Sequence, residues 1–129
     1  MEQQYVSIWF GKSKNEDEFY KFTEFAFEED VDEDDEYDGY TCEFAKEFDI
    51  DLNDIDEDFM EVNYSESMTS LSKLLEGCSY YDTFKEQIKD NLLDSVKGNS
   101  VILLYDYKYK GTKRKKHGMT FVGIFEYKK

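Results

Sequence analysis

An acidic run interrupts the first half of this chain and limits how that half can fold. Residues 28–38, EEDVDEDDEYD, place nine carboxylates in eleven positions. The run has no apolar periodicity, so we expect a surface loop and neither a helix nor a strand. The core must therefore be built from the segments on either side of this run.

The rest of the composition is rich enough in aromatic residues to build that core. The 129 residues include 11 Phe, 11 Tyr and one Trp, and each buried aromatic side chain removes about 150–250 Å² from water. A chain of this length is most simply one domain, and we expect a single domain over residues 1–129. Its core is predicted to include four apolar side chains: Trp9, Phe84, Ile88 and Leu103.

The formal net charge of −15 is distributed unevenly along the chain. Residues 1–64 hold 23 acidic and 4 basic side chains, a net charge of −19. Residues 65–129 hold 8 acidic and 12 basic side chains, a net charge of +4. Phosphate binding requires Lys and Arg, so the acidic half is not expected to bind nucleic acid directly. A protein with a basic surface is its natural partner.

The sequence contains no signal for secretion or membrane insertion. The N-terminus has no basic segment followed by a long apolar run, and the longest apolar stretch, residues 101–105, is far shorter than a membrane span. Cys42 and Cys78 form no Cys-x-x-Cys unit. We expect a cytoplasmic protein with two free thiols and no membrane partner.

Before and just after the acidic run, the patterns predict short elements. Residues 5–10 alternate apolar and polar side chains, which is typical of a strand with one buried face. Ser13 followed three residues later by Glu16 fits a capping box, and phenylalanines at helical spacing follow it. Beyond the run, residues 41–48 predict a short helix and residues 49–58 an irregular acidic segment.

The middle of the chain predicts a strand and two helices. Residues 59–64 alternate as a strand, and residues 67–76 predict a short helix closed by Gly77. Residues 80–96 predict the longest helix of the protein. Its apolar residues follow an i, i+4 stripe: Phe84, Ile88, Leu92 and Val96.

The C-terminal part predicts two strands that pair as a hairpin. Residues 100–110 are the strongest strand, with Tyr105, Tyr107 and Tyr109 expected on one face. Residues 119–127 are the final strand, joined to it by a basic connection at residues 111–117. The whole pattern predicts an α+β fold with a mixed, mainly antiparallel sheet of about four strands and helices packed on it.

No arrangement typical of catalysis is found in the sequence. The single histidine, His117, is flanked by cations in a loop and lacks the carboxylate that would orient a general base. Cys42 lies in the acidic half beside Glu43, whose charge raises a thiol pKa, so Cys42 and Cys78 are predicted to be small buried packing residues. The glycines form no phosphate-binding loop. We expect a protein that is not an enzyme and has no cofactor.

The acidic run does not match a calcium-binding loop in either possible register. An EF-hand requires Gly at position 6 and Glu at position 12. A loop starting at Asp34 has Gly39 at position 6 but Ala45 at position 12. A loop starting at Asp32 has Tyr37 where Gly is required. No dedicated metal site is expected, and weak association of calcium or magnesium with the run stays open.

The run has two readings, a solvated loop or a surface for a basic partner. Concentrated like charge costs self-repulsion, from which a protein with no basic partner gains nothing. Tyr37 and Tyr40 lie within or beside the run, and tyrosine is a preferred interface anchor. These two features favour the interaction surface.

Four short stretches resemble the immunity protein 22 family of bacterial polymorphic toxin systems. VSIWFG at residues 6–11 resembles that family's V-S-x-W-x-G opening, and DFMEV at residues 58–62 resembles its central strand. SVILLYDYKY at residues 100–109 and FVG at residues 121–123 resemble its last two strands. The resemblance implies a cytoplasmic α+β protein that binds and neutralises a toxin, with Trp9 in a core role, and it names no catalytic residue.

Charge and resemblance together predict how such a toxin would be bound. A nuclease presents a basic substrate groove, and clustered carboxylates would be steered toward it. An acidic DNA mimic or regulatory protein that binds a basic DNA-binding protein is the alternative, and the role of residues 113–117 stays open. The predicted partner-binding residues are Asp32, Glu33, Asp34, Asp35, Glu36, Tyr37, Asp38, Tyr40, Asp51, Asp54, Asp56, Glu57 and Asp58.

Overall fold

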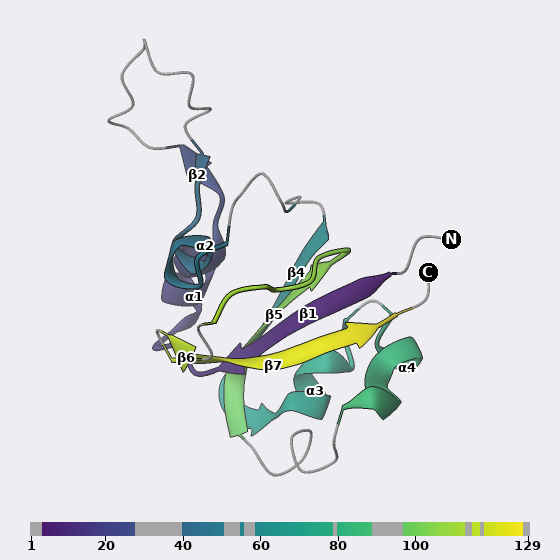
Figure 1. Ribbon diagram of the computed structural model, residues 1–129. Coiled ribbons are helices and arrows are strands. Elements are labelled where there is room, and N and C mark those ends of the chain that lie inside the picture. The colour runs from purple at the N-terminus through teal and green to yellow at the C-terminus, as the bar shows by residue number, and fades with distance from the viewer. Residues whose placement is uncertain are drawn as a thin grey trace.

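Short helices pack against a five-stranded sheet in the computed structural model (Figure 1). The structure describes residues 4–27, 40–50, 55, 59–78, 80–88, 97–112, 115–116 and 118–127. The strands lie in the order β4 (Met60–Ser70), β5 (Lys97–Tyr105), β1 (Tyr5–Gly11), β7 (Met119–Glu126) and β6 (Lys115–Lys116). The predicted α+β class is confirmed. The predicted count of about four strands is too low, and every pairing between the described neighbours is antiparallel.

Strand β1 is the middle one of the five strands, and both of its edges are paired. Ile8 lies opposite Leu103 of β5 on one side and opposite Gly123 of β7 on the other. The predicted hairpin between the last two long strands is therefore wrong, because β1 lies between them. Strand β5 is buried along almost its whole length, which requires a neighbour on each edge, and these neighbours are β4 and β1.

The connection from β5 to β7 is held in place by a hydroxyl of the central strand. Asp106 has a left-handed backbone (φ 59°), and β5 ends just before it. The Ser7 hydroxyl then donates a hydrogen bond to the carbonyl of Tyr107 (2.7 Å) and accepts one from the N–H of Tyr109 (3.0 Å). The chain thereby crosses over β1 before β7 begins, which explains why β5 and β7 are not neighbours.

The same turn separates the tyrosines that were predicted to share one face. Tyr105 packs in a core with Tyr127, whereas Tyr109 packs beside Trp9 in a core on the other side of the sheet. Alternation along a strand holds only while the strand continues, and this strand ends at Tyr105. The predicted common face of Tyr105, Tyr107 and Tyr109 is wrong for that reason.

Strand β4 is longer than its alternating pattern predicts. It continues from Met60 to Ser70, with a shift of register against β5 between Tyr64 and Thr69. The predicted helix at residues 67–76 therefore begins later, as α3 (Leu71–Leu75), with Ser70 as its N-cap. Residues 67–69 still belong to β4, and Met68 is exposed, so no buried apolar face pulls them into the helix.

The first two helices are confirmed, with one corrected cap. Helix α1 (Glu16–Thr23) is capped by Asn15, whose side chain accepts a hydrogen bond from the N–H of Glu18 (2.9 Å). Ser13 is not the cap, because its backbone N–H donates to the side chain of Asn99 (2.8 Å). Helix α2 (Glu43–Glu47) lies inside the range predicted for it.

The predicted long helix at residues 80–96 does not continue through Ile88. Helix α4 (Tyr81–Phe84) continues as one 3₁₀ turn, η3 (Lys85–Gln87), and Ile88 is already extended. Gln87 explains the ending, because its side chain donates to the carbonyl of Glu126 (2.6 Å) and accepts from the N–H of Glu126 (3.0 Å). Residues 89–96, including Leu92 and Val96 of the predicted stripe, lie outside the described part of the chain.

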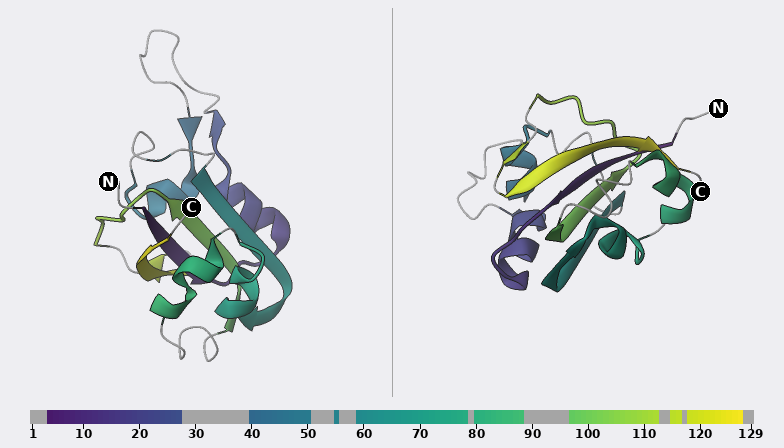
Figure 2. Two further views of the ribbon diagram at one scale, coloured as in Figure 1. Left: turned by 90° about the vertical axis from the view of Figure 1, so that its right-hand side faces the viewer. Right: turned by 90° about the horizontal axis from the view of Figure 1, so that it is seen from below.

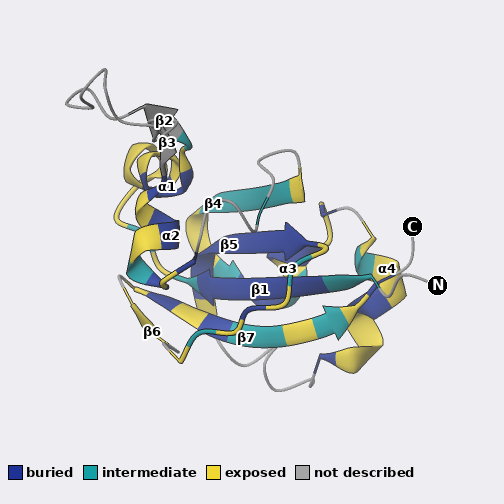
Figure 3. Ribbon diagram, turned by 45° about the horizontal axis from the view of Figure 1, so that its top comes forward, coloured by how far each residue is buried: buried dark blue, intermediate teal, exposed yellow. Residues whose placement is uncertain are grey.

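Two cores lie on the two faces of the sheet (Figure 3). The first core packs α3 and α4 against Val6, Ile8 and Phe10 of β1. The second core packs α1 and α2 against Trp9, whose ring centroid lies 4.9–5.7 Å from those of four aromatic rings: Phe44, Phe48, Tyr109 and Phe121. The predicted core residues Trp9, Phe84, Ile88 and Leu103 are all buried, so that prediction is confirmed.

Two glycines let three strands approach closely at one end of the sheet. A Cβ atom on Gly11 would lie only 2.0 Å from the carbonyl oxygen of Gly118 in the turn before β7. A Cβ atom on Gly98 would lie 2.5 Å from the carbonyl oxygen of Gly11 and 2.8 Å from the ring of Phe10. The Phe10 ring thus lies against a strand position that has no side chain, and this contact fixes the end of the sheet.

Phe84→Ala should destabilise the fold by about 3–5 kcal/mol, because the buried ring leaves a cavity in the first core. Urea denaturation followed by circular dichroism measures this loss. Phe59→Ala is the matched control, since that ring is 42% exposed and its removal should cost much less. Equal midpoints for the two variants would contradict the placement of Phe84.

Gly98→Ala should also destabilise the protein, by about 1–3 kcal/mol, because the new methyl group collides with backbone and ring atoms that cannot both move away. Gly77→Ala provides the control, as its Cβ atom would meet only the Asn63 side chain at 3.6 Å. The same denaturation experiment compares the two. If Gly98→Ala proved as stable as Gly77→Ala, the close packing of β1 against β5 at this end would be wrong.

Candidate functional site

Of the residues predicted to bind a partner, only Tyr40 lies in the described part of the chain. Tyr40 begins β3 (Tyr40–Thr41) and pairs with Phe27 at the end of β2 (Ala26–Phe27). The other predicted residues, at positions 32–38, 51, 54 and 56–58, lie outside the described residues, as does His117. The β2–β3 ladder therefore pairs the two described segments that flank the acidic run in the sequence.

The two helices next to this ladder form an acidic layer of their own. Figure 2 shows α1 and α2 together on one side of the sheet and α3 and α4 on the other. Residues 16–27 and 40–50 contain seven carboxylates against two lysines, Lys21 and Lys46. The carboxylates are Glu16, Asp17, Glu18, Glu24, Glu43, Glu47 and Asp49. Three of them occupy the first turn of α1, where the helix dipole favours negative charge.

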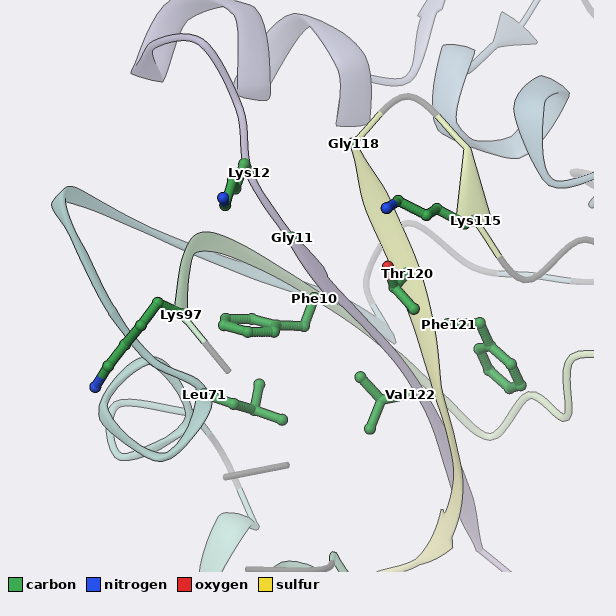
Figure 4. Close-up of a pocket in the computed structure, with 10 residues that line it drawn as sticks. All are labelled: Phe10, Gly11, Lys12, Leu71, Lys97, Lys115, Gly118, Thr120, Phe121 and Val122. Atoms are coloured by element: carbon green, nitrogen blue, oxygen red, sulfur yellow. The ribbon is translucent and has the colours of Figure 1, made fainter. Parts of the chain in front are cut away.

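A hollow lined by lysines lies on the face of the sheet opposite the acidic helices α1 and α2. It is at the end of the sheet where Gly11 and Gly98 let the strands approach closely. Its volume is about 430 Å³. Its lining comes from β1, β5, β6, β7 and α3, and Figure 4 draws these residues: Phe10, Gly11, Lys12, Leu71, Lys97, Lys115, Gly118, Thr120, Phe121 and Val122. None of the ten is acidic. We call this site the lysine-rimmed hollow.

The hollow combines an apolar floor with a cationic rim. Phe10, Leu71 and Val122 gather at its centre, and Phe10 and Leu71 belong to the first core (Figure 4). The exposed side chains of Lys12, Lys97 and Lys115 stand around this centre. The arrangement suits an apolar group that carries negative charge nearby.

A cluster of tyrosines and carboxylates lies at the other end of the same face. The Tyr105 hydroxyl donates to Glu61 (2.7 Å), and the Tyr127 hydroxyl donates to Asp106 (2.6 Å). Both hydroxyls thus serve as donors in the folded state, and the Tyr80 ring packs against both tyrosine rings.

These contacts keep the titratable groups of the cluster protonated. Burial, followed by the hydrogen bond and charge of Glu61, raises the pKa of Tyr105 well above its usual range. Burial and the hydrogen bond to Asp106 act in the same direction on the pKa of Tyr127. Burial, with a contribution from the charge of Glu61, raises the pKa of Cys78 to about 12. A thiol with such a pKa is a poor nucleophile at neutral pH.

The structure confirms the predicted role of the two cysteines. Cys42 and Cys78 are not joined in a disulfide, and both are buried. The Cys78 thiol donates to the carbonyl of Leu74 at 3.5 Å, and the Cys42 thiol donates to the carbonyl of Thr23 at 3.5 Å. Cys78 packs in the first core, and Cys42 packs in the second core.

The described residues offer neither a metal-binding cluster nor a membrane-spanning helix. Among the described residues, no three His, Cys, Asp or Glu side chains are placed to hold a metal ion. No helix within those residues is long and apolar enough to cross a membrane.

The lysine-rimmed hollow was missed by sequence reasoning, although a signal exists. In the sequence, Gly11 ends the first strand pattern and Gly98 follows the helical pattern of residues 80–96. Each of these glycines is next to a lysine in the chain, Lys12 and Lys97. Glycine with an adjacent lysine at two strand ends marks a place where backbones meet closely and cations gather, but only the strand order shows that the two ends are neighbours.

The raised pKa values predict that stability falls as the pH rises from about 9 to about 12. The unfolded chain loses the protons of Cys78 and the tyrosines near 9.0 and 10.0, whereas the folded chain retains them. The stabilisation from these groups is therefore complete below pH 9 and is lost as the pH approaches the folded-state values. Melting temperatures measured between about pH 8.5 and about pH 11.5 test this.

Tyr105→Phe removes one of the responsible groups, so its melting temperature should fall less steeply with pH than that of the wild type. The control is Tyr20→Phe, which changes an exposed tyrosine of α1 and should keep the wild-type slope. Parallel curves for Tyr105→Phe and the wild type would show that this cluster does not cause the alkaline loss.

Comparison with known proteins places the chain in a family. A search of curated proteins and a search of solved structures found no match. The family model described as Immunity protein 22 matches residues 6–128. This match begins in β1 and ends beyond β7, so it includes both cores, the acidic run and the lysine-rimmed hollow. The chain belongs to the immunity protein 22 family.

Proposed function

We propose that this protein binds and neutralises a nuclease toxin by presenting clustered carboxylates to the toxin's basic substrate groove. The observation that carries the proposal is the concentration of charge, since residues 1–64 bear a net charge of −19. Membership of an immunity protein family supports the inhibitory role. The carboxylates of α1 and α2 support the acidic run as the contact, because they extend its negative potential over the adjacent layer.

The proposed mechanism needs no chemistry from the inhibitor. A nuclease groove accommodates phosphates with Lys and Arg, and a set of fixed carboxylates competes for the same cations. Long-range attraction accelerates the encounter, whereas desolvated contacts set how long the complex lasts. Tyr37 and Tyr40 are the proposed anchors, since tyrosine combines a large apolar ring with a hydroxyl that hydrogen-bonds. We place the inhibitor in the cytoplasm, where it would protect the producing cell.

Neutralising four residues of the acidic run should slow association with the cognate toxin. The variant is Asp32→Asn, Glu33→Gln, Asp34→Asn and Asp35→Asn. We expect its association rate to fall by about tenfold or more at about 50 mM salt and by much less at about 300 mM, because salt screens steering. Surface plasmon resonance at both salt concentrations measures both rates.

The matched control removes four negative charges elsewhere, from the same starting net charge of −15. It changes exposed residues of the other half of the chain to Gln: Glu66, Glu76, Glu86 and Glu126. If position matters, the control should associate almost as fast as the wild type. Equal slowing of both variants would attribute the effect to total charge, and unchanged rates for both would return the acidic run to the solvated-loop reading.

Replacing Tyr37 or Tyr40 with Ala should change the dissociation rate instead of the association rate. An interface anchor is worth about 2 kcal/mol or more, so dissociation should accelerate by about thirtyfold with little change in association. The alternative of a DNA mimic makes a different prediction. The protein would then capture a DNA-binding protein that has no nuclease activity, and it would have no affinity for the cognate toxin.

A further inference from the structure

The lysine-rimmed hollow has chemistry opposite to that of the proposed toxin-binding face. Its three lysines come from three different places in the chain: Lys12 after β1, Lys97 at the start of β5 and Lys115 in β6. They gather on a protein whose net charge is −15, and none of the described residues that line the hollow is acidic. A basic toxin groove would be repelled there, so this site requires a different kind of partner group.

The rim lysines are not engaged by the neighbouring carboxylates that the structure describes. Among those residues, the ion pair of Lys85 with Asp82 (3.4 Å) involves none of the three rim lysines. Bringing three ammonium groups together costs like-charge repulsion, which a bound anion would relieve. Their positions are fixed by backbone packing, since the N–H of Lys12 donates to the carbonyl of Gly118 (3.0 Å).

The floor of the hollow is apolar because the helices cover only part of this face of the sheet. Leu71 begins α3, and its side chain lies beside Phe10 of β1 and Val122 of β7 (Figure 4). The Phe10 ring rests on Gly98 and closes the bottom. Val122 is only partly buried and Thr120 is exposed, so the hollow opens along β7. An apolar side chain entering here would remove its own surface and that of the floor from water.

We propose that the lysine-rimmed hollow docks a peptide segment of a partner protein in which a bulky apolar side chain is flanked by Asp or Glu. A small-molecule site places a few buried polar groups within its cavity. In this hollow the cations stand at the exposed rim and the centre is apolar, which is the arrangement of a protein–protein contact. The inference does not rest on the proposed function, because the group it binds has the opposite charge to a nuclease groove.

A titration with a short peptide tests the docking directly on the full chain. The probe is acetyl-Asp-Glu-Phe-Asp-Glu-amide, added up to about 5 mM and followed by the backbone amide shifts of Gly11, Gly98 and Gly118 in ¹H–¹⁵N spectra. We expect saturable shifts at these glycines with a dissociation constant of about 1 mM or lower. No saturable shift at any of the three overturns the proposal.

Two control peptides separate the apolar and the ionic contributions. Replacing Phe with Ala in the probe should abolish the shifts, and replacing its acids with Asn and Gln should weaken binding by about fivefold or more. Equal binding of the neutral peptide would remove the role of the lysines. Tighter binding of 3-phenylpropionate than of the peptide would assign the hollow to a small anion and overturn the docking of a protein segment.

Variants of the protein complete the test. Lys97→Gln combined with Lys115→Gln should weaken binding of the acidic probe by about fivefold while leaving the neutral peptide unaffected. Lys73→Gln is the control, since this exposed lysine of α3 lies outside the hollow and should keep wild-type affinity. The same spectra report whether each variant is folded. None of these measurements uses the toxin, so their outcome is independent of the proposed function.

Discussion

Both cores depend on the alternation of side chains along β1, the middle strand of the five-stranded sheet. Val6, Ile8 and Phe10 enter the first core, and Trp9 enters the second. Because successive residues of a strand point to opposite faces, a shift of one residue would exchange these two sets. Ser7 makes such a shift costly, since its fully buried hydroxyl is satisfied only by Tyr107 and Tyr109 of the crossing connection. The Trp9 indole N–H has no acceptor among the described residues, so packing against four rings outweighs that loss.

The sequence predicts those features that depend on local pattern and misses those that depend on pairing between distant segments. Periodicity alone predicts the strand at residues 5–10, the burial of Trp9 and Leu103, and the small helix near residue 44. The false hairpin arises because adjacency in the chain is the only pairing signal a single sequence offers. The helix predicted through Ile88 is wrong because Gln87 finds its partner at Glu126, a contact between residues 39 positions apart. The lysine-rimmed hollow is hidden for the same reason, as its lysines meet only through the strand order.

Charge and topology together give the molecule two surfaces of different character. The β2–β3 ladder pairs the two segments that flank the acidic run in the sequence, next to the acidic helices α1 and α2. The lysine-rimmed hollow lies on the face of α3, with the sheet between it and the second core. Screening in salt limits how far one surface neutralises the other. A chain with an overall charge of −15 can therefore hold a local cationic site.

The two hydrogen bonds between Gln87 and Glu126 have a consequence for self-association. They reproduce, with a side-chain amide, the donor and acceptor pair that a neighbouring strand would offer to the outer edge of β7. At the other end of β7, Lys115 and Lys116 occupy the same edge as the two-residue strand β6. An added strand from a second molecule would have to displace an amide at one end and two cations at the other. The edge is thereby guarded against the growth of intermolecular sheets, a hazard that any exposed strand otherwise carries.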